Sequence, residues 1–267
     1  MVWEGLGKIS CILVMCMKGV VLAGGRGTRL LPLTKNKNKH LLPLGKEPMI
    51  FNPVKQMIYS GIKEIMVITG EDAIDEMRGL LIKYMGSVCR FSFVVQPAAG
   101  GIAEALLLSE EFSNNEPLLV ILGDNIAAHS IKPYVDKYRK RKAGAMLLLK
   151  DVDDPKRYGI AGFCDGKLAN IVEKPVSPES SFAVTGIYMY DHNVFQYIRE
   201  TKPANGGEWG ITPVNLRYLQ AGRLAYEKLR GFWIDAGTVE SYHYAHEMLL
   251  RIENKIICGD EYEDTLQ

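Results

Sequence analysis

Short apolar segments rich in valine and isoleucine alternate with amphipathic segments over the first half of the chain. The apolar segments have the length and composition of buried strands, and they are Gly19–Ala23, Glu64–Thr69, Phe91–Val95, Leu118–Leu122 and Ala145–Leu149. Segments with helical spacing lie between them, at Pro48–Ser60, Ala73–Met85, Ile102–Phe112 and Ile131–Arg141. This repeated order of strand and helix predicts a three-layer, Rossmann-like α/β fold, with a mainly parallel sheet covered on both faces.

The alternation of strand and helix changes after about residue 150. A turn-rich break at Asp151–Pro155 is followed by short strand-like segments at Tyr158–Phe163, Leu168–Val172 and Phe182–Tyr190. We expect this part to complete the sheet and to add a small β lobe that faces a substrate. Near the end of the chain, Glu240–Glu253 has a helical pattern. The predicted division is therefore an extension (1–16), one domain (17–241) with halves at about 17–150 and 151–241, and a C-terminal helix and tail (242–267).

Composition and charge narrow the classes of partner. The chain has 267 residues with 47% apolar content, which is enough for one large α/β domain. Its 32 basic residues against 31 acidic ones leave a formal charge of +1. That balance provides no net field for a nucleic-acid backbone or an acidic membrane. No apolar run approaches the ~18–20 residues that span a bilayer, so we expect neither nucleic acid nor membrane as a partner.

The five cysteines are an odd number with scattered spacing and form no C-x-x-C pair. This pattern argues against structural zinc and a disulfide framework, and indicates free thiols in a cytoplasmic protein. The apolar segment Ile9–Met17 follows Lys8 as in a signal peptide, but no small-x-small cleavage site precedes the glycine-rich stretch. We therefore interpret residues 1–16 as an extension, with Met17 as the natural start.

A glycine-rich turn follows the first predicted strand. Gly24, Gly25 and Gly27 let backbone amides approach an anion closely, and Arg29 adds a planar guanidinium that suits phosphate oxygens. The turn lacks the Gly-Lys-Ser/Thr of a Walker A loop, and Leu30 stands where G-x-G-x-x-G needs its third glycine. A tight strand-to-helix turn without a ligand is the alternative interpretation.

Three further residues have the chemistry of a phosphate and metal site. Lys39 directly precedes an apolar LLPL segment that would fix it near the glycine turn, whereas Lys35 and Lys37 fit a solvated loop. Asp124 ends the apolar segment LLVILGD, and Asp235 follows Phe232-Trp233-Ile234. A carboxylate in such surroundings needs water, a cation or a donor. A helix N-cap or turn aspartate is the alternative for both.

The order of these motifs resembles the sugar-phosphate nucleotidyltransferase family, and within it the glucose-1-phosphate thymidylyltransferases. The likeness begins with G-G-x-G-T-R-L, P-x-T and K-x-L-L-P, and it runs from Met17 to about Ser241. Each motif is weak alone, but their order and spacing together are specific. The later ones are Gln96-Pro97, Leu122-Gly123-Asp124-Asn125, Asp154-Pro155-x-Arg157-Tyr158-Gly159, Glu173-Lys174-Pro175, Val184-Thr185-Gly186-Ile187-Tyr188 and Trp233-Ile234-Asp235-Ala236-Gly237-Thr238.

The resemblance implies nucleotidyl transfer from a nucleoside triphosphate to a sugar 1-phosphate, with pyrophosphate released by direct in-line displacement. It favours dTTP and glucose 1-phosphate, and it allows UTP because one methyl group changes binding by only ~1 kcal/mol. It implies Mg²⁺ as the cofactor, held by Asp124 and Asp235, and leaves assembly into a homo-oligomer open. Arg29 and Lys39 would be the catalytic cations. The implied nucleotide contacts are Leu22, Gly24, Gly25, Gly27, Thr28, Gln96, Gly101 and Asp124, and the implied sugar-phosphate contacts are Gly159, Glu173, Lys174 and Val184, with Glu208 as a further sugar contact.

Two segments depart from the family pattern. The run from Ala98 to Glu104 has Ala for Pro and Glu for Gln, and the family's Gly-Glu-Leu-Glu-Ile-Thr-Asp becomes Gly207-Glu208-Trp209-Gly210-Ile211-Thr212-Pro213. These changes leave the base and the hexose open rather than the reaction class.

Two other classes remain as alternatives. A nucleotide-sugar-dependent glycosyltransferase would need an Asp-x-Asp motif, which Asp124-Asn125-Ile126 lacks. A non-catalytic regulatory subunit that binds a nucleotide sugar would have lost Arg29, Lys39 or Asp124, and all three are present. The enzymatic interpretation requires Asp124 and Asp235 to lie together, close to Arg29.

Overall fold

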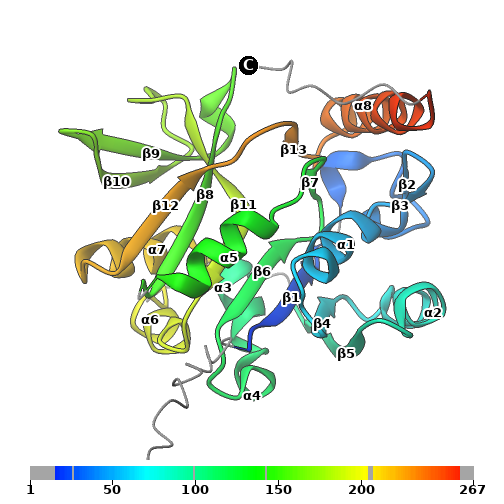
Figure 1. Ribbon diagram of the computed structural model, residues 1–267, viewed down its shortest axis with the longest axis horizontal. Coiled ribbons are helices and arrows are strands. Elements are labelled where there is room, and N and C mark those ends of the chain that lie inside the picture. Colours follow the sequence, from blue (N-terminus) through cyan, green and yellow to red (C-terminus); the bar gives the residue numbers. More distant parts are fainter. Residues whose placement is uncertain (1–15, 26, 99, 142, 204–206, 259–267) are drawn as a thin grey trace, which may run out of the picture.

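The computed structural model describes residues 16–258, except 26, 99, 142 and 204–206. Its central sheet has nine strands, and Figure 1 shows it running through the middle of the molecule. The first half of the chain supplies neighbouring strands that pair in parallel, in the order β6-β1-β4-β5. Their bounds are β1 Lys18–Ala23, β4 Glu64–Thr69, β5 Arg90–Val95 and β6 Leu118–Leu122.

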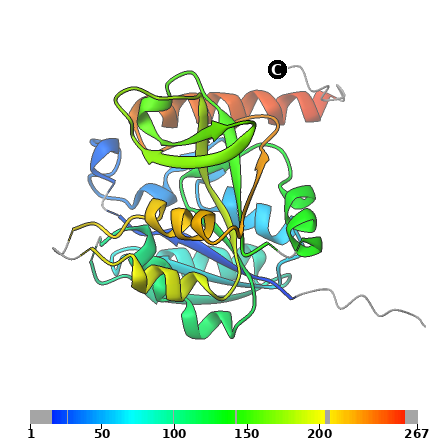
Figure 2. The ribbon, with the colours of Figure 1, turned by 90° about the vertical axis from the view of Figure 1, so that its left-hand side faces the viewer.

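The second half of the chain extends this sheet with strands in mixed orientation. β11 lies antiparallel to both β6 and β8, while β12 lies parallel to β8. A hairpin of β9 and β10 continues the sheet beyond β11 and projects as a small lobe (Figures 1 and 2). The bounds are β8 Ala145–Asp151, β9 Gly159–Cys164, β10 Lys167–Glu173, β11 Phe182–Tyr190 and β12 Leu224–Lys228.

Helices cover both faces of the sheet, because side chains of the buried strands alternate between two hydrophobic clusters. In β1, Val21 and Ala23 belong to one cluster, and Val20 and Leu22 belong to the other. The first cluster lies under α1 (Phe51–Tyr59), α2 (Ile74–Met85) and α5 (Lys132–Lys140). The second lies under α3 (Ile102–Leu107), α6 (Val194–Glu200) and α7 (Thr212–Gln220). The predicted three-layer α/β fold is therefore confirmed.

A third hydrophobic cluster fixes the chain around the glycine turn. It joins Leu30 and Leu42 to Phe232 and to the helix α8 (Val239–Cys258). Tyr242 of α8 donates a hydrogen bond to Pro43 O, and Gly45 N donates to His246 Nδ1 at 3.2 Å. Figure 1 shows α8 beside two small paired units, which are β2 (Pro43–Leu44) with β3 (Glu47–Pro48), and β7 (Asn125–Ala127) with β13 (Trp233–Asp235).

Some predicted boundaries are wrong. The helix expected to begin at Pro48 begins at Phe51, because Pro48 pairs in β3. The single helix expected over Ile102–Phe112 is two, α3 and α4 (Glu110–Ser113). Between them the buried Ser109 hydroxyl donates to Leu106 O at 2.6 Å, a local bond that competes with the helical ladder. The C-terminal helix continues past Glu253 to Cys258.

Two predictions on the chain ends fall largely outside the described part. The proposed extension covers residues 1–16, of which only Cys16 is described, and the tail after residue 258 is not described. Among the described helices, none has the length and apolar character needed to cross a bilayer.

Candidate functional site

The carboxyl ends of β1 and β6 place the glycine turn beside Asp124. The two strands pair in parallel with Leu22 opposite Leu122, and Gly123 N donates to Leu22 O at 2.8 Å. The turn and the Gly-Asp step therefore leave the sheet side by side. Open α/β sheets bind their ligands at this edge.

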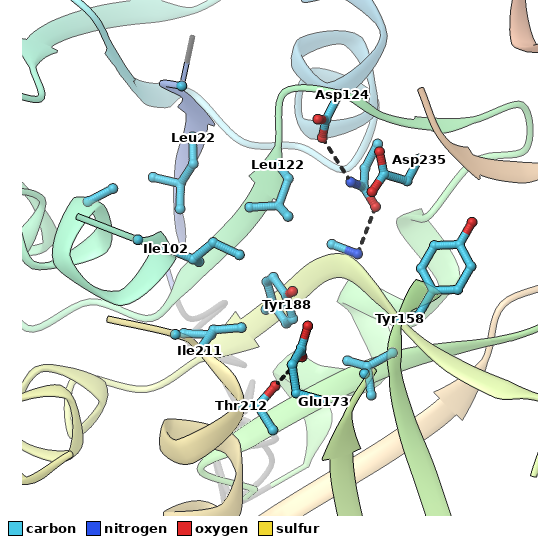
Figure 3. A pocket seen from close by; sticks show the side chains of 18 of the residues that line it. Leu22, Ile102, Leu122, Asp124, Tyr158, Glu173, Tyr188, Ile211, Thr212 and Asp235 are labelled. Atoms are coloured by element: carbon cyan, nitrogen blue, oxygen red, sulfur yellow. Dashed lines mark hydrogen bonds between the residues drawn. The ribbon is translucent and has the colours of Figure 1, made fainter. Parts of the chain in front are cut away.

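Pairing of β7 with β13 brings the second aspartate to the same place. Asp235 is opposite Asn125 in this pair, and Ala236 N donates to Asp124 O at 2.9 Å. A β-carbon added to Gly237 would lie 2.6 Å from Asp235 Oδ1, 3.5 Å from Asp124 Oδ2 and 3.2 Å from Arg29 Nη2. Both acids and Arg29 thus surround one small space, as the enzymatic interpretation requires, and Figure 3 shows the two aspartates together at one end of the cavity.

The pKa values of the two carboxyl groups shift in opposite directions because their neighbours differ. Burial alone would raise the pKa of Asp124, but the ammonium of Lys39, which is ion-paired with Asp124 Oδ2, holds that pKa well below its usual range. Burial, and then the charge of Asp124, raises the pKa of Asp235 to about 6. Gly237 N, which donates to Asp235 Oδ1 at 2.8 Å, works in the opposite direction.

Asn125 fixes the orientation of Asp124. Its Nδ2 donates to Asp124 Oδ1 at 3.2 Å, while its Oδ1 accepts from Gly186 N at 2.7 Å and from Trp233 Nε1 at 3.1 Å. A β-carbon on Gly186 would lie 2.6 Å from this amide, so a glycine is needed there. The buried amide thereby ties the carboxylate to β11 and β13.

Lys39 begins a short 3-10 helix (Lys39–Leu41), and the next residue, His40, is buried against Gly123. Asn38 Oδ1 accepts from His40 N at 3.0 Å and caps the turn. Burial, reinforced by the charge of Lys39, lowers the pKa of His40 to about 3, so the ring is neutral. The ring lies against Gly123, where a β-carbon would be 2.6 Å from His40 Cδ2. The neutral imidazole therefore fills space between Lys39 and the Gly-Asp step without adding charge.

The two aspartates suit a divalent cation. Among the described residues, no group of three or more His, Cys, Asp or Glu side chains could enclose a metal alone. A cation that takes only one or two carboxylates and completes its shell with phosphate oxygens fits this pair. It would also offset the burial, and then the repulsion from Asp124, that raise the pKa of Asp235.

One wall of the cavity carries the residues predicted to read the base. Gln96 follows β5, and its backbone is fixed by a 2.8 Å hydrogen bond from Gln96 N to Thr69 O. A β-carbon on Gly24 would lie 2.3 Å from Gln96 Oε1, so a side chain there would push the amide away from its position beside the turn. Gly101 has φ +108 at the start of α3, and it lines the same wall.

The opposite wall carries the residues predicted to hold the sugar phosphate. Gly159 and Glu173 are opposite each other in the β9–β10 hairpin. Thr212 Oγ1, at the start of α7, donates to Glu173 Oε2 at 2.9 Å, as Figure 3 shows. Lys174 adopts φ +44, uncommon for a residue with a side chain, and its backbone N donates to Tyr158 O at 2.9 Å. This local bond fixes where the Glu173-Lys174 pair leaves the strand.

The cavity has a volume of about 660 Å³ and spans both walls. It brings together nearly all of the predicted residues from both halves of the chain. Gly27 and Thr28 are not among the residues that line it, and Gly27 instead accepts a 2.8 Å hydrogen bond from Thr34 Oγ1. A contact of these two residues with the nucleotide stays a prediction. The predicted residues that line the cavity are Leu22, Gly24, Gly25, Arg29, Lys39, Gln96, Gly101, Asp124, Gly159, Glu173, Lys174, Val184, Glu208 and Asp235.

Comparison with known proteins agrees with this geometry. Residues 18–252 match the sequence profile of the family described as nucleotidyl transferase. The chain belongs to this family. The glucose-1-phosphate thymidylyltransferase of Neisseria meningitidis serogroup A is 37% identical over 253 residues, which cover 92% of this chain and 88% of that relative. The enzyme of the same name from Xanthomonas campestris strain B100 is 38% identical, covering 91% of this chain and 85% of the relative.

Solved structures of similar proteins share the fold of this nucleotidyl transferase. A putative glucose-1-phosphate thymidylyltransferase from Bacillus anthracis, in complex with a sucrose, is 46% identical with a TM-score of 0.84, covering 88% of this chain and 95% of that one. A UDP-glucose pyrophosphorylase complexed with UDP-glucose is 27% identical with a TM-score of 0.78, covering 89% of this chain and all of that one.

The sequence interpretation assigned no role to several residues that line the cavity of this nucleotidyl transferase. Most of them lie inside the motifs already quoted, next to a residue that was assigned. Their positions in those motifs could have marked them as candidate site residues. Adjacency in sequence alone, however, does not show which side chains face the cavity. Thr212 also lies in a quoted segment, Gly207–Pro213, but its hydrogen bond to Glu173 is what points to a role for it. Other unassigned residues in the quoted motifs that line the cavity include Asn125, Arg157, Tyr158, Tyr188 and Trp233.

Proposed function

We propose that this nucleotidyl transferase joins a nucleoside triphosphate to a sugar 1-phosphate and releases pyrophosphate, with dTTP and glucose 1-phosphate as the favoured pair and UTP as a second nucleotide. One observation carries the proposal. Asp124, Asp235, Arg29 and Lys39 converge at one end of a cavity whose opposite wall holds Glu173. The names of the relatives support the choice of base and hexose.

The proposed chemistry is a single displacement. A phosphate oxygen of the sugar 1-phosphate attacks the α-phosphorus of the triphosphate, the bond from that phosphorus to the bridging oxygen breaks, and pyrophosphate leaves with that oxygen. Catalysis of this kind depends on positioning and on stabilising charge. Arg29 would stabilise the leaving pyrophosphate, and Lys39 would hold the triphosphate while it keeps Asp124 ionised.

We propose Mg²⁺ as the cofactor, held by Asp124 and Asp235. When bound, it would supply positive charge to the phosphate oxygens during the displacement. Glu173, oriented by Thr212, would accept hydrogen bonds from sugar hydroxyls, and Lys174 would contact the sugar phosphate. Residues 17–150 would thus bind the nucleotide and 151–241 the sugar phosphate. The free thiols of Cys16, Cys89 and Cys164 fit a cytoplasmic location.

The test is release of pyrophosphate with a panel of nucleoside triphosphates and sugar 1-phosphates, each with Mg²⁺. We expect release with dTTP and glucose 1-phosphate, weaker or equal release with UTP, and none when the sugar phosphate is omitted. Lys39→Ala and Asp124→Asn should each reduce kcat by at least about a hundredfold, because removing one charge-stabilising group typically costs that much. Tight nucleotide-sugar binding without release from any pair would instead support the non-catalytic regulatory subunit.

A further inference from the structure

The segment 207–211 joins the two walls of the cavity through backbone hydrogen bonds. Trp209 N donates to Gly100 O at 2.7 Å, and Ala103 N donates to Trp209 O at 2.9 Å. The second bond satisfies an amide in the first turn of α3, whose N-cap residue is Gly101 and has no side chain to cap it. The sugar-side half of the chain therefore completes the start of a helix on the nucleotide side.

The backbone of Trp209 lies so close to Gly101 that a side chain at position 101 would clash with it. A β-carbon on Gly101 would lie 2.5 Å from Trp209 O and 2.7 Å from Trp209 N. The φ of +108 at Gly101 also disfavours any residue with a side chain. The backbone of Trp209 thus presses directly against the residue predicted to contact the base.

The indole of Trp209 anchors this segment to α6. Its Nε1 donates to Ile198 O at 3.2 Å, near the end of that helix, and the ring packs against the second hydrophobic cluster. The ammonium of Lys202 lies 5.5 Å from the ring centroid, within cation–π range. The anchor to Ile198 thus depends on the indole N–H of Trp209.

We propose that Trp209 is a positioning residue for the nucleotide. Its indole fixes segment 207–211 to α6, and its backbone holds Gly101 and the first turn of α3 in place against the base. Of the sugar-side residues, Glu208 lies in segment 207–211, whereas Thr212 and Glu173 are held separately, by α7 and by their own hydrogen bond. Loss of the indole should therefore weaken nucleotide binding more than sugar-phosphate binding. This proposal rests on the proposed function, since it assumes that the cavity binds a nucleoside triphosphate.

The test is calorimetric binding of dTTP with Mg²⁺ and without sugar phosphate, combined with steady-state kinetics. We expect Trp209→Ala to raise the Kd and the KM for dTTP on the order of tenfold, with kcat and the KM for glucose 1-phosphate within about threefold. Trp209→Phe keeps an aromatic ring but loses the Nε1 donor to Ile198 and the pyrrole part of the indole, so it should raise the Kd by about threefold. If Trp209→Ala does not fold, the test rests on Trp209→Phe. An unchanged Kd for dTTP in that variant overturns the proposal.

The matched control is Tyr197→Ala. Tyr197 is an aromatic residue of α6 that packs on the same cluster, with its ring 4.7 Å from that of Tyr218, and it does not line the cavity. We expect its truncation to lower Tm while leaving the Kd for dTTP within about twofold. Equal increases in Kd for Tyr197→Ala and Trp209→Ala would show a purely structural role and overturn the proposal. A wild-type protein that binds no nucleoside triphosphate would overturn the proposed function itself.

Discussion

At the residue scale, two aspartates a few ångströms from one glycine have opposite pKa shifts. Lys39 lowers the pKa of Asp124, while burial and Asp124 together raise that of Asp235 to about 6. A lowered folded-state pKa stabilises the fold at pH values above the unfolded value of about 3.9, and this stability is lost as the pH falls towards the folded value. A raised folded-state pKa has the opposite effect, because ionising the group is less favourable in the folded than in the unfolded state. The ionised Asp235 therefore lowers the free energy of unfolding at pH 7.

Asp235→Asn should therefore stabilise the protein while it abolishes turnover. At pH 7 we expect the free energy of unfolding to rise by about 1–3 kcal/mol, because the amide removes a buried charge whose pKa is raised by roughly two units. The gain should shrink as the pH falls from about 6 towards 4 and be absent below about pH 4, where the wild-type carboxyl group is protonated in both states. Urea unfolding of the wild-type protein and the variant, at pH 7 and below about pH 4, measures this difference in the free energy of unfolding.

Asp124→Asn is the comparison, and it should destabilise the protein at pH 7 by leaving Lys39 unpaired in a largely buried position. If both variants lose stability at pH 7, the charge states assigned to the two acids are wrong.

Activity should fall on the acid side as Asp235 takes up a proton. With a pKa of about 6, this group is half protonated at about that pH, and a protonated carboxyl group binds a cation poorly. We expect kcat/KM at low Mg²⁺ to fall with a slope of one proton below about pH 6. Raising the Mg²⁺ concentration should move the midpoint to lower pH, because the proposed cation and the proton would compete for Asp235. A midpoint that does not depend on Mg²⁺ would argue against this competition.

At the element scale, the small β7–β13 pair builds the site more directly than the large sheet does. It sets Asp235 opposite Asn125 and leaves Gly237 facing both acids and Arg29. Gly237 has no positive φ, so its backbone tolerates a side chain and only the space around it is limiting.

Gly237→Ala should therefore lower kcat/KM by at least about a hundredfold, with little loss of stability, because its methyl group would displace Asp235 from the productive geometry. Gly79→Ala is the control, since it lies inside α2 with no atom within 4 Å of the added carbon. That variant should keep full activity and gain about 0.5–1 kcal/mol. If Gly237→Ala and Gly79→Ala have comparable activities, the space beside Gly237 is not needed to keep Asp235 in position.

The difference between the long strands of the main sheet and the short β7–β13 pair explains which parts of the structure the sequence could predict. The strands β1, β4 and β6 are continuous apolar runs bounded by turns, so periodicity and length identify them. The strands β7 and β13 have three residues each, too few for any period to appear, and their pairing sets Asp235 opposite Asn125, which lies 110 residues earlier in the chain (235 − 125). The meeting of Asp124 and Asp235 was predicted from resemblance, whereas its mechanism was visible only in the structure.

At the scale of the whole molecule, the cavity draws its walls from both halves of the chain. Gln96 and Gly101 come from the first half, while Gly159 and Glu173 come from the second. A ligand that contacts both halves binds the folded state and not the unfolded one, so it stabilises the protein by mass action.

A nucleotide sugar at a hundred times its Kd should add about 2.7 kcal/mol and raise Tm by roughly 5–10 °C. Differential scanning calorimetry with dTDP-glucose and with glucose alone separates specific binding from a general sugar effect. Equal shifts with both compounds would contradict a cavity that spans nucleotide and sugar.

The pairing of β7 with β13 also has a consequence for synthesis on the ribosome. Asp124 emerges early, but its partner acid is made more than a hundred residues later, in the last strand before α8. A nascent chain that has already formed β1, β4, β5 and β6 still lacks one of the two carboxylates. Catalytic competence therefore arises only after Asp235 has been synthesised, and truncated products that end before Trp233 would lack this carboxylate and remain inert.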